Sequence, residues 1–231
     1  MLGVNHLMSR TGLRRISYLA RSMNIISTVR ILATSICVLL LSGADGRTEP
    51  LVDKARQQIG VTKSYDPAYR KLGYPGGDVP LETGVCSDVV VRAFRGIKID
   101  LQKEIHEDMA KAFAQYPPKW GLKRPDLNID HRRVPNLMTY FQRKGWSVPL
   151  TKKPADFSSG DMVAWNLGGG VTHIGIISDR RSTSGVPLVI HNIGQGVHEE
   201  DILFAYQIIG HYRPQFNIEP TGAATGASPR R

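Results

Sequence analysis

The chain has 231 residues, enough for one domain of ordinary size with its own hydrophobic core. Apolar residues make up 41% of it and charged residues 22%, and no internal repeat is visible, which excludes a fibrous chain and a largely disordered one. Lysine and arginine number 30 against 20 acidic residues, giving a net charge of +10. No nucleic-acid motif and no basic stripe interleaved with aromatic residues accompanies this charge, so a nucleic-acid partner is not predicted.

Residues 1–44 have the composition of an export signal. They contain five arginines and no acidic residue, and they end in the apolar run Ile31–Leu41 and the small residues Ser42-Gly43-Ala44. The run is too short to span a bilayer, which takes about 20 apolar residues. We therefore expect a cleaved signal peptide, with Met23 as an alternative start, and an exported, periplasmic protein without a stable membrane span. An uncleaved anchor or an amphipathic helix is the alternative.

Cleavage after Ala44 would leave 25 basic and 20 acidic residues, a net charge of +5, and a single cysteine, Cys86. The remaining positive charge favours anionic surroundings such as a cell wall or a membrane surface. A protein with one cysteine forms no internal disulfide. A lone thiol in an oxidising compartment is therefore either buried and inert or used in chemistry, and the sequence around Cys86 has to decide.

Helices are predicted in the first part of the chain that follows the signal. They are Pro50–Gly60, Ser87–Arg95, Asp100–Phe113 and Pro135–Lys144. The third has an apolar residue at every fourth position and Asp100 as its N-cap. The second contains β-branched residues that also suit a strand, but Cys86, Val90 and Phe94 share one helical face, which favours a helix. An ordered loop, Val61–Val85, precedes it.

Strands are predicted in the last third of the chain, separated by turns rich in glycine and serine. They are Asp161–Asn166, Thr172–Ser178, Pro187–Ile193 and Ala205–Tyr212. Helices followed by an antiparallel sheet predict an α+β domain over residues 45–214. The tail, residues 215–231, is small and polar and is predicted to be disordered.

Cys86 is the candidate nucleophile. If the next residues form a helix, Cys86 lies at its N-terminus, where free N–H groups and the helix dipole favour the reactive thiolate. The same N–H groups are suited to stabilising an oxyanion. Gly84 would let the backbone turn sharply into the helix.

A cysteine nucleophile needs a base, and a histidine held by a third group is the usual one. His173 begins one predicted strand and His191 lies in the next. A hairpin that pairs these two residues leaves Arg180–Ser184 as its turn and places both imidazoles on one face, where they can hydrogen-bond. A one-residue slip would separate them. The alternative is a purely structural hydrogen bond between the two.

These motifs resemble the NlpC-type peptidoglycan peptidases, a papain-like superfamily. Such proteins carry Tyr and a Gly pair before a helix-starting Cys, then a strand opening with Gly-Asp, a strand reading His-x-Gly-Ile, and an Ile-His segment. The matching residues here are Tyr74, Gly76, Gly77 and Cys86; Gly160 and Asp161; His173, Gly175 and Ile176; and Ile190 and His191.

A closer resemblance, over Lys54–Tyr212, is to an exported bacterial family catalogued as domain of unknown function 1287. The segments that carry this resemblance include YPGGDVP, GVCSDVVVRAFR, HIGIISD and HNIG. The two resemblances imply a papain-like core, a Cys86–His173–His191 triad, cleavage of amide bonds in peptidoglycan peptides through an acyl-enzyme, a monomer, and no cofactor. The chain departs from the NlpC pattern at Val85, Asp88 and Pro75, which leaves its substrate specificity open.

Further polar residues are candidates for substrate binding: Tyr74, Asp88, Arg132, Arg133 and Asn192. Tyr74 would donate to the oxyanion, unless it is only a packed loop residue. Arg132 and Arg133 would clamp a carboxylate, unless one of them pairs with Asp130. Asn192 could replace His191 as the orienting group, although strand alternation points it to the opposite face.

Other classes of function are weighed on the same residues. No His-Glu-x-x-His or paired-cysteine motif is present, so no metal site is predicted. An acyltransferase or thioesterase would use the same three residues with a different acceptor. A non-catalytic module that binds the cell wall would keep the fold and leave Cys86 unreactive.

Overall fold

The computed structural model describes residues 48–216. The predicted signal peptide, residues 1–44, and nearly all of the predicted tail therefore lie outside the described residues, and both remain predictions. Within residues 48–216, no helix has the length and apolar character needed to cross a membrane.

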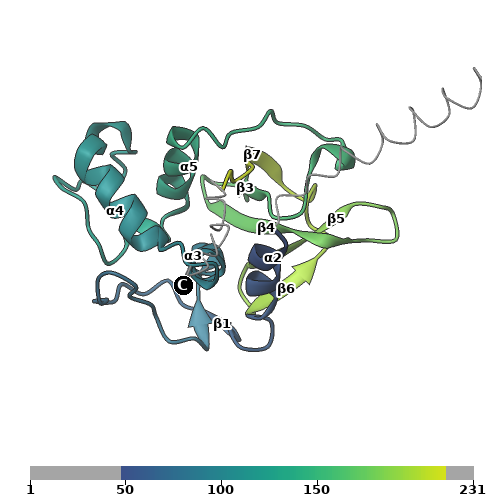
Figure 1. Cartoon of the computed structure of the whole chain (residues 1–231), viewed down its shortest axis with the longest axis horizontal. Coiled ribbons are helices and arrows are strands. Elements are labelled where there is room, and N and C mark those ends of the chain that lie inside the picture. Colours follow the sequence, from purple (N-terminus) through teal and green to yellow (C-terminus); the bar gives the residue numbers. More distant parts are fainter. Residues whose placement is uncertain (1–47, 217–231) are drawn as a thin grey trace, which may run out of the picture. The chain divides into compact units, whose positions relative to one another are not determined.

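The described part of the chain, residues 48–216, contains four α-helices where four were predicted. Their bounds are α2 (Thr48–Arg56), α3 (Cys86–Gly96), α4 (Leu101–Ala112) and α5 (Val134–Arg143). Asp100 caps α4 as expected, because its carboxylate accepts the N–H of Gln102 at 3.1 Å. Short 3₁₀ turns occupy Phe113–Gln115, Asp130–Arg132 and Pro154–Asp156. Figure 1 shows α3 in the middle of the domain, with α4 and α5 to one side and α2 to the other.

The main sheet has five antiparallel strands in the order β6-β5-β4-β3-β7. Their bounds are β3 (Met162–Asn166), β4 (Thr172–Arg181), β5 (Pro187–Asn192), β6 (Val197–Glu200) and β7 (Gln207–Tyr212). Four of them were predicted and β6 was not. A separate parallel pair, β1 (Ser64–Tyr65) with β2 (Thr83–Gly84), lies inside the predicted loop. The α+β fold class is confirmed.

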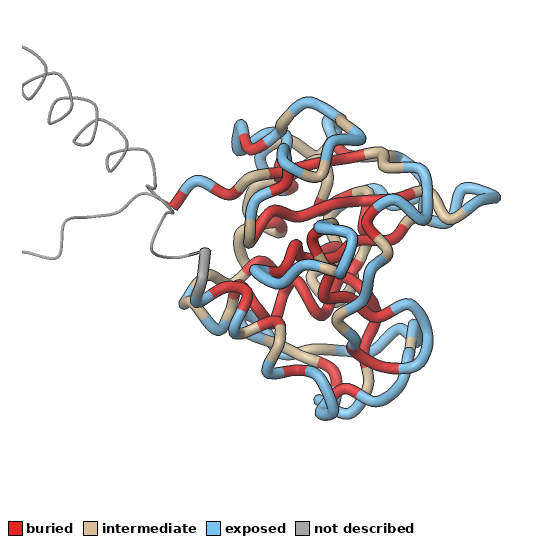
Figure 2. Tube along the Cα trace, turned by 90° about the vertical axis from the view of Figure 1, so that its right-hand side faces the viewer, coloured by how far each residue is buried: buried red, intermediate tan, exposed pale blue. Residues whose placement is uncertain are grey.

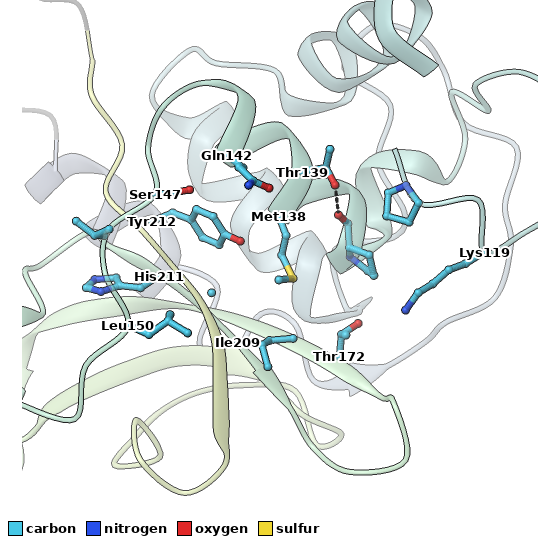
Figure 3. A pocket seen from close by; sticks show the side chains of 14 residues that line it. Lys119, Met138, Thr139, Gln142, Ser147, Leu150, Thr172, Ile209, His211 and Tyr212 are labelled. Carbon is cyan, nitrogen blue, oxygen red and sulfur yellow. Dashed lines mark hydrogen bonds between the residues drawn. The ribbon is translucent and has the colours of Figure 1, made fainter. Parts of the chain in front are cut away.

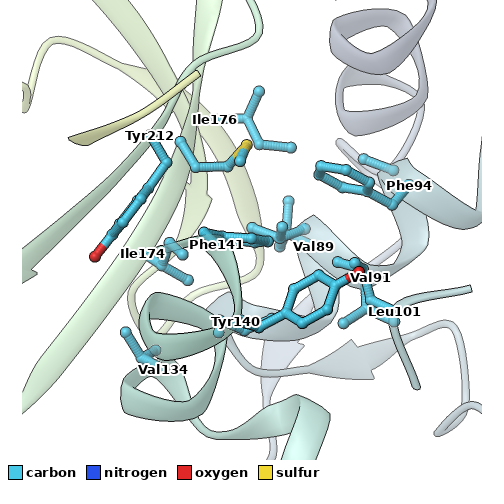
Figure 4. Close-up of a cluster of buried hydrophobic side chains, with 14 of the residues drawn as sticks. Val89, Val91, Phe94, Leu101, Val134, Tyr140, Phe141, Ile174, Ile176 and Tyr212 are labelled. Atoms are coloured by element: carbon cyan, nitrogen blue, oxygen red, sulfur yellow. The ribbon is translucent and has the colours of Figure 1, made fainter. Parts of the chain in front are cut away.

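The helices cover one face of the sheet, and strand alternation divides the core between the two faces. In β3, Met162 and Ala164 belong to the large cluster that the helices share, whereas Val163 and Trp165 belong to a smaller cluster on the other face. Figure 4 shows the large cluster, in which Phe94 of α3 packs against strand and α5 side chains. Figure 2 shows that buried residues run through the interior strands and helices while exposed ones lie at the turns.

The packed part of the chain extends slightly beyond the predicted boundary at residue 214. Phe216 is buried, and its ring lies 6.1 Å from that of Phe94 and 6.4 Å from that of Trp146. Packing in this structure thus continues two residues past the predicted boundary.

Candidate active site

Cys86 is the first residue of α3, and the residues around it explain why the helix begins there. Val85 has an extended backbone, and its N–H donates to Asp88 Oδ2 at 2.7 Å, which satisfies one of the free donors of the first turn. Gly84 is not in the left-handed region; a Cβ there would lie only 3.2 Å from Arg92 Nη1 and from Asp88 Oδ2. Glycine is therefore needed for close packing and not, as expected, for a sharp turn.

The thiol of Cys86 lies among three hydrogen-bond donors. They are the backbone N–H groups of Ile174 and Ser87 and the hydroxyl of Tyr65. Burial nevertheless outweighs these donors and raises the pKa of the thiol to about 11. The pKa of the thiol therefore shifts opposite to the direction expected from the helix N-terminus alone, because desolvation penalises the charged form more than the N-terminus favours it.

His173 and His191 form the expected pair. His173 Nε2 and His191 Nδ1 are 3.1 Å apart, and the two rings are nearly perpendicular, with centroids 5.1 Å apart. Both side chains are buried. Burial, together with the neighbouring His191, lowers the pKa of His173 to about 3, so its imidazole is neutral near neutral pH.

The predicted hairpin register is wrong by two residues. The structure pairs Ile176 with Ile190 and Ile177 with Val189, so His191 lies beside Gly175 and not opposite His173. A shift of two keeps both histidines on one face, which is why the contact survives. Gly175 is what makes room, since a Cβ there would lie 3.1 Å from His191 Cβ and 2.6 Å from Val189 Cγ1.

Cys86 lies near the first residues of β4, the strand that carries His173. The backbone N–H of Ile174, the residue that follows His173, favours the charged form of the Cys86 thiol, and the pairing of β4 with β5 begins only at Ile176. Among the described residues, no hydrogen bond joins the thiol to the His173 ring. The thiol thus lies near the strand that carries His173, and both groups are in their neutral forms.

Asn192 does not contact His173. Its Nδ2 donates to the carbonyl oxygens of Gly84 at 3.0 Å and Ser64 at 3.3 Å, so it holds the short β1–β2 pair that leads into Cys86. Alternation had pointed it away from the histidines, and the structure agrees. The prediction that Asn192 binds substrate finds no support in this geometry, because the side chain is fully buried.

Asp88 and Arg132 form a buried ion pair beneath the thiol. Arg132 Nε and Nη2 donate to the two carboxylate oxygens of Asp88 at 2.9 and 3.0 Å, and its other donors reach the carbonyls of Asp66 and Ala68. Such a bidentate pair braces the start of α3 against the loop that carries Tyr65. Asp88 was expected in the substrate cleft; it points instead into this brace.

Arg133 pairs with Asp130, which was the alternative to clamping a substrate carboxylate. Its Nη1 pairs with Asp130 Oδ1 at 2.9 Å, and its guanidinium lies 4.1 Å from the centre of the Trp120 ring. Neither arginine is therefore a free clamp for a substrate carboxylate. Both still contribute positive charge to the surface of the cleft that they line.

Tyr74 is not at the site. Its ring packs edge-on against His106 at 5.1 Å, and the tyrosine beside the thiol is Tyr65. Tyr65 was not recognised in the sequence because its position depends on the pairing of β1 with β2, which aligns Tyr65 with Gly84. No local sequence pattern predicts a parallel pair of strands that are only two residues long.

A cleft of about 500 Å³ opens above the thiol. Its walls come from the loops around Tyr65 and Trp120, from the start of α5, and from the turn before β4; the lining includes Cys86 and Thr172 but not His173. The ionisable lining residues, besides Cys86 and Tyr65, are Lys119, Arg132 and Arg133, and no acidic residue lines the cleft. The charged side chains that line the cleft are therefore all basic, although two of them are paired with acids behind the lining.

A second groove of about 450 Å³ continues the cleft past Pro135 and Thr172, which line both. Figure 3 shows it between α5, which contributes Met138, and β7, which contributes Ile209. Lys119 reaches over the junction towards Thr172. The two hollows together form a long surface with an apolar far end. In residues 48–216 no cluster of three or more metal-binding side chains occurs.

Comparison with known proteins places the chain in a family. Residues 52–214 match the family described as "Domain of unknown function (DUF1287)". The chain belongs to this family. It is 62% identical over 163 residues to "Uncharacterized protein YijF" from Escherichia coli (strain K12), an alignment that covers 71% of this chain and 80% of that protein. The family resemblance inferred from the sequence is thereby confirmed, and neither name states an activity.

A solved structure with a related arrangement is "Structure of NlpC1 from Trichomonas vaginalis". The alignment has 13% sequence identity and a TM-score of 0.40, and it covers 75% of this chain. The chain spans 45% of the length of that protein. The family's function has to be inferred from the site itself.

Proposed function

We propose that this protein is an exported cysteine hydrolase that cleaves amide bonds in peptidoglycan peptides. The observation that carries the proposal is the position of Cys86. Its thiol lies at a helix N-terminus, forms part of the lining of a cleft, and contacts the backbone directly beside a buried, hydrogen-bonded histidine pair. An inert buried cysteine requires none of these arrangements.

Catalysis would start from the neutral pair. When a substrate carbonyl is bound over the thiol, His173 Nδ1 takes the Cys86 proton while the sulfur attacks the carbonyl carbon. The tetrahedral intermediate collapses, the C–N bond breaks, and His173 returns the proton to the leaving amine. Water then attacks the thioester, giving the acid and the free thiol. The ring of His173 has to approach the sulfur in the substrate complex, as is common for hydrogen bonds that are long without substrate.

Two groups near the sulfur are suited to donate to the oxyanion. The backbone N–H of Ser87 and the hydroxyl of Tyr65 both lie at the sulfur, close to where the carbonyl oxygen of a bound substrate would develop charge. Burial raises the pKa of Tyr65 well above its usual range, so its hydroxyl keeps its proton and remains a donor.

Peptide stems of the cell wall carry free carboxylates, which suits a cleft lined by cations and no acids. Lys119 is the cation best placed to bind one, because it has no ion-pair partner among the described residues, whereas Arg132 and Arg133 are paired. The predicted periplasmic location would bring protein and substrate together. The long cleft accommodates an extended peptide on both sides of the scissile bond.

The test is digestion of purified peptidoglycan by the mature protein, followed by mass spectrometry of the fragments. We expect fragments shortened at one defined amide bond, and loss of that cleavage in Cys86→Ala with retained folding by circular dichroism. Adding an amine acceptor separates hydrolysis from acyl transfer, since only a transferase incorporates the amine. Equal cleavage by Cys86→Ala and the native protein would eliminate the proposal.

A further inference from the structure

Nε2 of His191 is the ring nitrogen that does not face His173. It has one polar neighbour, which is not one of the three proposed catalytic residues. His191 Nε2 is buried and makes no hydrogen bond among the described residues, but Glu200 Oε2 lies 3.4 Å from it. Glu200 is 44% exposed at its side chain, so it can rotate, and His191 is its one ionic contact in residues 48–216. At this distance a small rotation of the exposed Glu200 side chain is enough to form a hydrogen bond to His191 Nε2.

Strand pairing puts Glu200 there. His191 of β5 pairs with His198 of β6, so Glu200, two residues further along β6, points to the same face. Glu199 points to the other face, where it pairs with Arg56 and Arg180. Two adjacent glutamates thus have different partners, and Glu200 alone faces the histidine pair.

The protonation pattern of the pair depends on this contact. A carboxylate accepts a hydrogen bond, so Glu200 favours a proton on His191 Nε2 and leaves His191 Nδ1 as an acceptor. His173 must then carry its proton on Nε2 in order to donate across the 3.1 Å contact. Its Nδ1 is left with a lone pair, which a base for the Cys86 thiol requires. The opposite tautomers would leave His173 unable to accept a proton at Nδ1.

We propose that Glu200 is a positioning residue that fixes the tautomers of His191 and His173, so that His173 Nδ1 is free to act as the base. The proposal rests on the proposed function of Cys86 and His173 and adds a fourth member to their chain. Glu200 also stabilises the imidazolium that forms on His173, through the polarised His191.

Other charged groups near His191 do not replace Glu200. The titratable groups that face His191 are His173 on β4 and Glu200 and His198 on β6. The His198 ring is exposed and its Nδ1 contacts the carbonyl of Gly196 at 3.2 Å. Burial lowers the pKa of His191 while Glu200 raises it, and burial is the larger effect. Both imidazoles are therefore neutral near neutral pH, and what Glu200 affects is which tautomer each one adopts.

The test is nuclear magnetic resonance of ¹⁵N-histidine-labelled protein near neutral pH, in which nitrogen shifts distinguish the two tautomers. We expect His191 and His173 both to carry the proton on Nε2 in the native protein. Glu200→Ala should shift both residues towards mixed tautomers, and Glu200→Gln, whose amide oxygen still accepts a hydrogen bond, should restore the native pattern. Asp201→Asn, an exposed neighbour with the same loss of charge, is the matched control.

The rate of Cys86 alkylation by iodoacetamide provides the functional readout. We expect a loss of roughly tenfold in Glu200→Ala at neutral pH, a smaller loss in Glu200→Gln and none in Asp201→Asn. A native His191 protonated on Nδ1, or a Glu200→Ala protein with unchanged tautomers and alkylation, would overturn the role of Glu200. Neither measurement needs a substrate. If Glu200→Ala alters the tautomers but the native protein does not cleave peptidoglycan, only the proposed function is rejected. If Glu200→Ala cleaves peptidoglycan normally, only this inference is rejected.

Discussion

At the scale of single residues, burial sets the chemistry of the site. It raises the pKa of Cys86 to about 11 and lowers the pKa of His173 to about 3, so each group is held in its neutral form. A preformed thiolate, which the helix N-terminus alone would favour, does not fit these pKa directions. Proton transfer would instead accompany attack on a bound carbonyl, and a neutral thiol is less readily oxidised than a thiolate.

Lys119 should determine affinity for anionic substrates. Replacing it in Lys119→Gln removes the one cation of the cleft that has no ion-pair partner in residues 48–216, and should raise KM about fivefold with kcat unchanged. Steady-state kinetics on muropeptides at low salt is the measurement. Lys123→Gln, a change at a residue that does not line the cleft, is the control. Equal KM values for Lys119→Gln and the native protein would show that the cleft charge does not bind substrate.

At the scale of elements, the site depends on how strands and short segments meet. The Asp88–Arg132 pair joins the start of α3 to the Tyr65 loop, Asn192 joins β5 to the β1–β2 pair, and Gly175 lets β4 and β5 bring their histidines together. Each contact links residues that are distant in the chain or on different strands. The elements position the site, and no single one of them contains it.

Gly175→Ala tests the packing between β4 and β5. The new Cβ would lie 2.6 Å from Val189 Cγ1 and 3.1 Å from His191 Cβ, so one strand has to move. We expect the free energy of unfolding in urea to fall by about 1–3 kcal/mol and the His173–His191 contact to lengthen. Gly73→Ala, where a Cβ meets nothing within 4 Å, should be close to neutral. A Gly175→Ala protein as stable as the native one would contradict this account of the motif.

Local patterns predicted the elements that have a strong period. The four-residue spacing along α4 and the Asp100 cap led to the correct helix, and alternation placed His173 and His191 on one face. β6 was missed because VHEE is short, charged and at a sheet edge. The two-residue register error arose because β4 continues to Arg181, so the turn begins later than the sequence indicated.

Contacts between residues that are far apart in the chain could not be predicted from the spacing of residues in the sequence. The Asp88–Arg132 pair spans 44 residues, and Tyr65 meets Cys86 only through the β1–β2 pairing. Tyr74 was singled out because it stands in a glycine-rich motif, yet the fold turns it towards His106. The residues that could carry out the chemistry were identified from the sequence. Most of the residues that contact them could be identified only from the three-dimensional structure.

At the scale of the whole molecule, buried neutral histidines make stability depend on pH. Burial lowers the pKa of His131 to about 4 and that of His173 to about 3, against 6.5 for an exposed histidine. As pH falls below 6.5, the unfolded chain takes up protons that the folded chain does not, so the folded state loses stability. The loss continues down to the folded pKa values.

Urea unfolding between pH 6.5 and about 4.5, above most carboxylate titrations, should show this loss. We expect each buried histidine to contribute about 1.4 kcal/mol per pH unit to the slope. His131→Gln should remove one such share, whereas His198→Gln, at an exposed position, should leave the slope unchanged. A native stability that is flat across this window would mean that these histidines are not buried neutral in solution.

The pH dependence of Cys86 alkylation, in the native protein and in His173→Ala, tests the central pairing most directly. If His173 is the base for a thiol whose pKa is raised, the native protein should react roughly tenfold or more faster than His173→Ala at neutral pH. The two rates should converge in alkali, where the thiol ionises unaided. Superimposable profiles across the whole range would show that Cys86 and His173 do not act together.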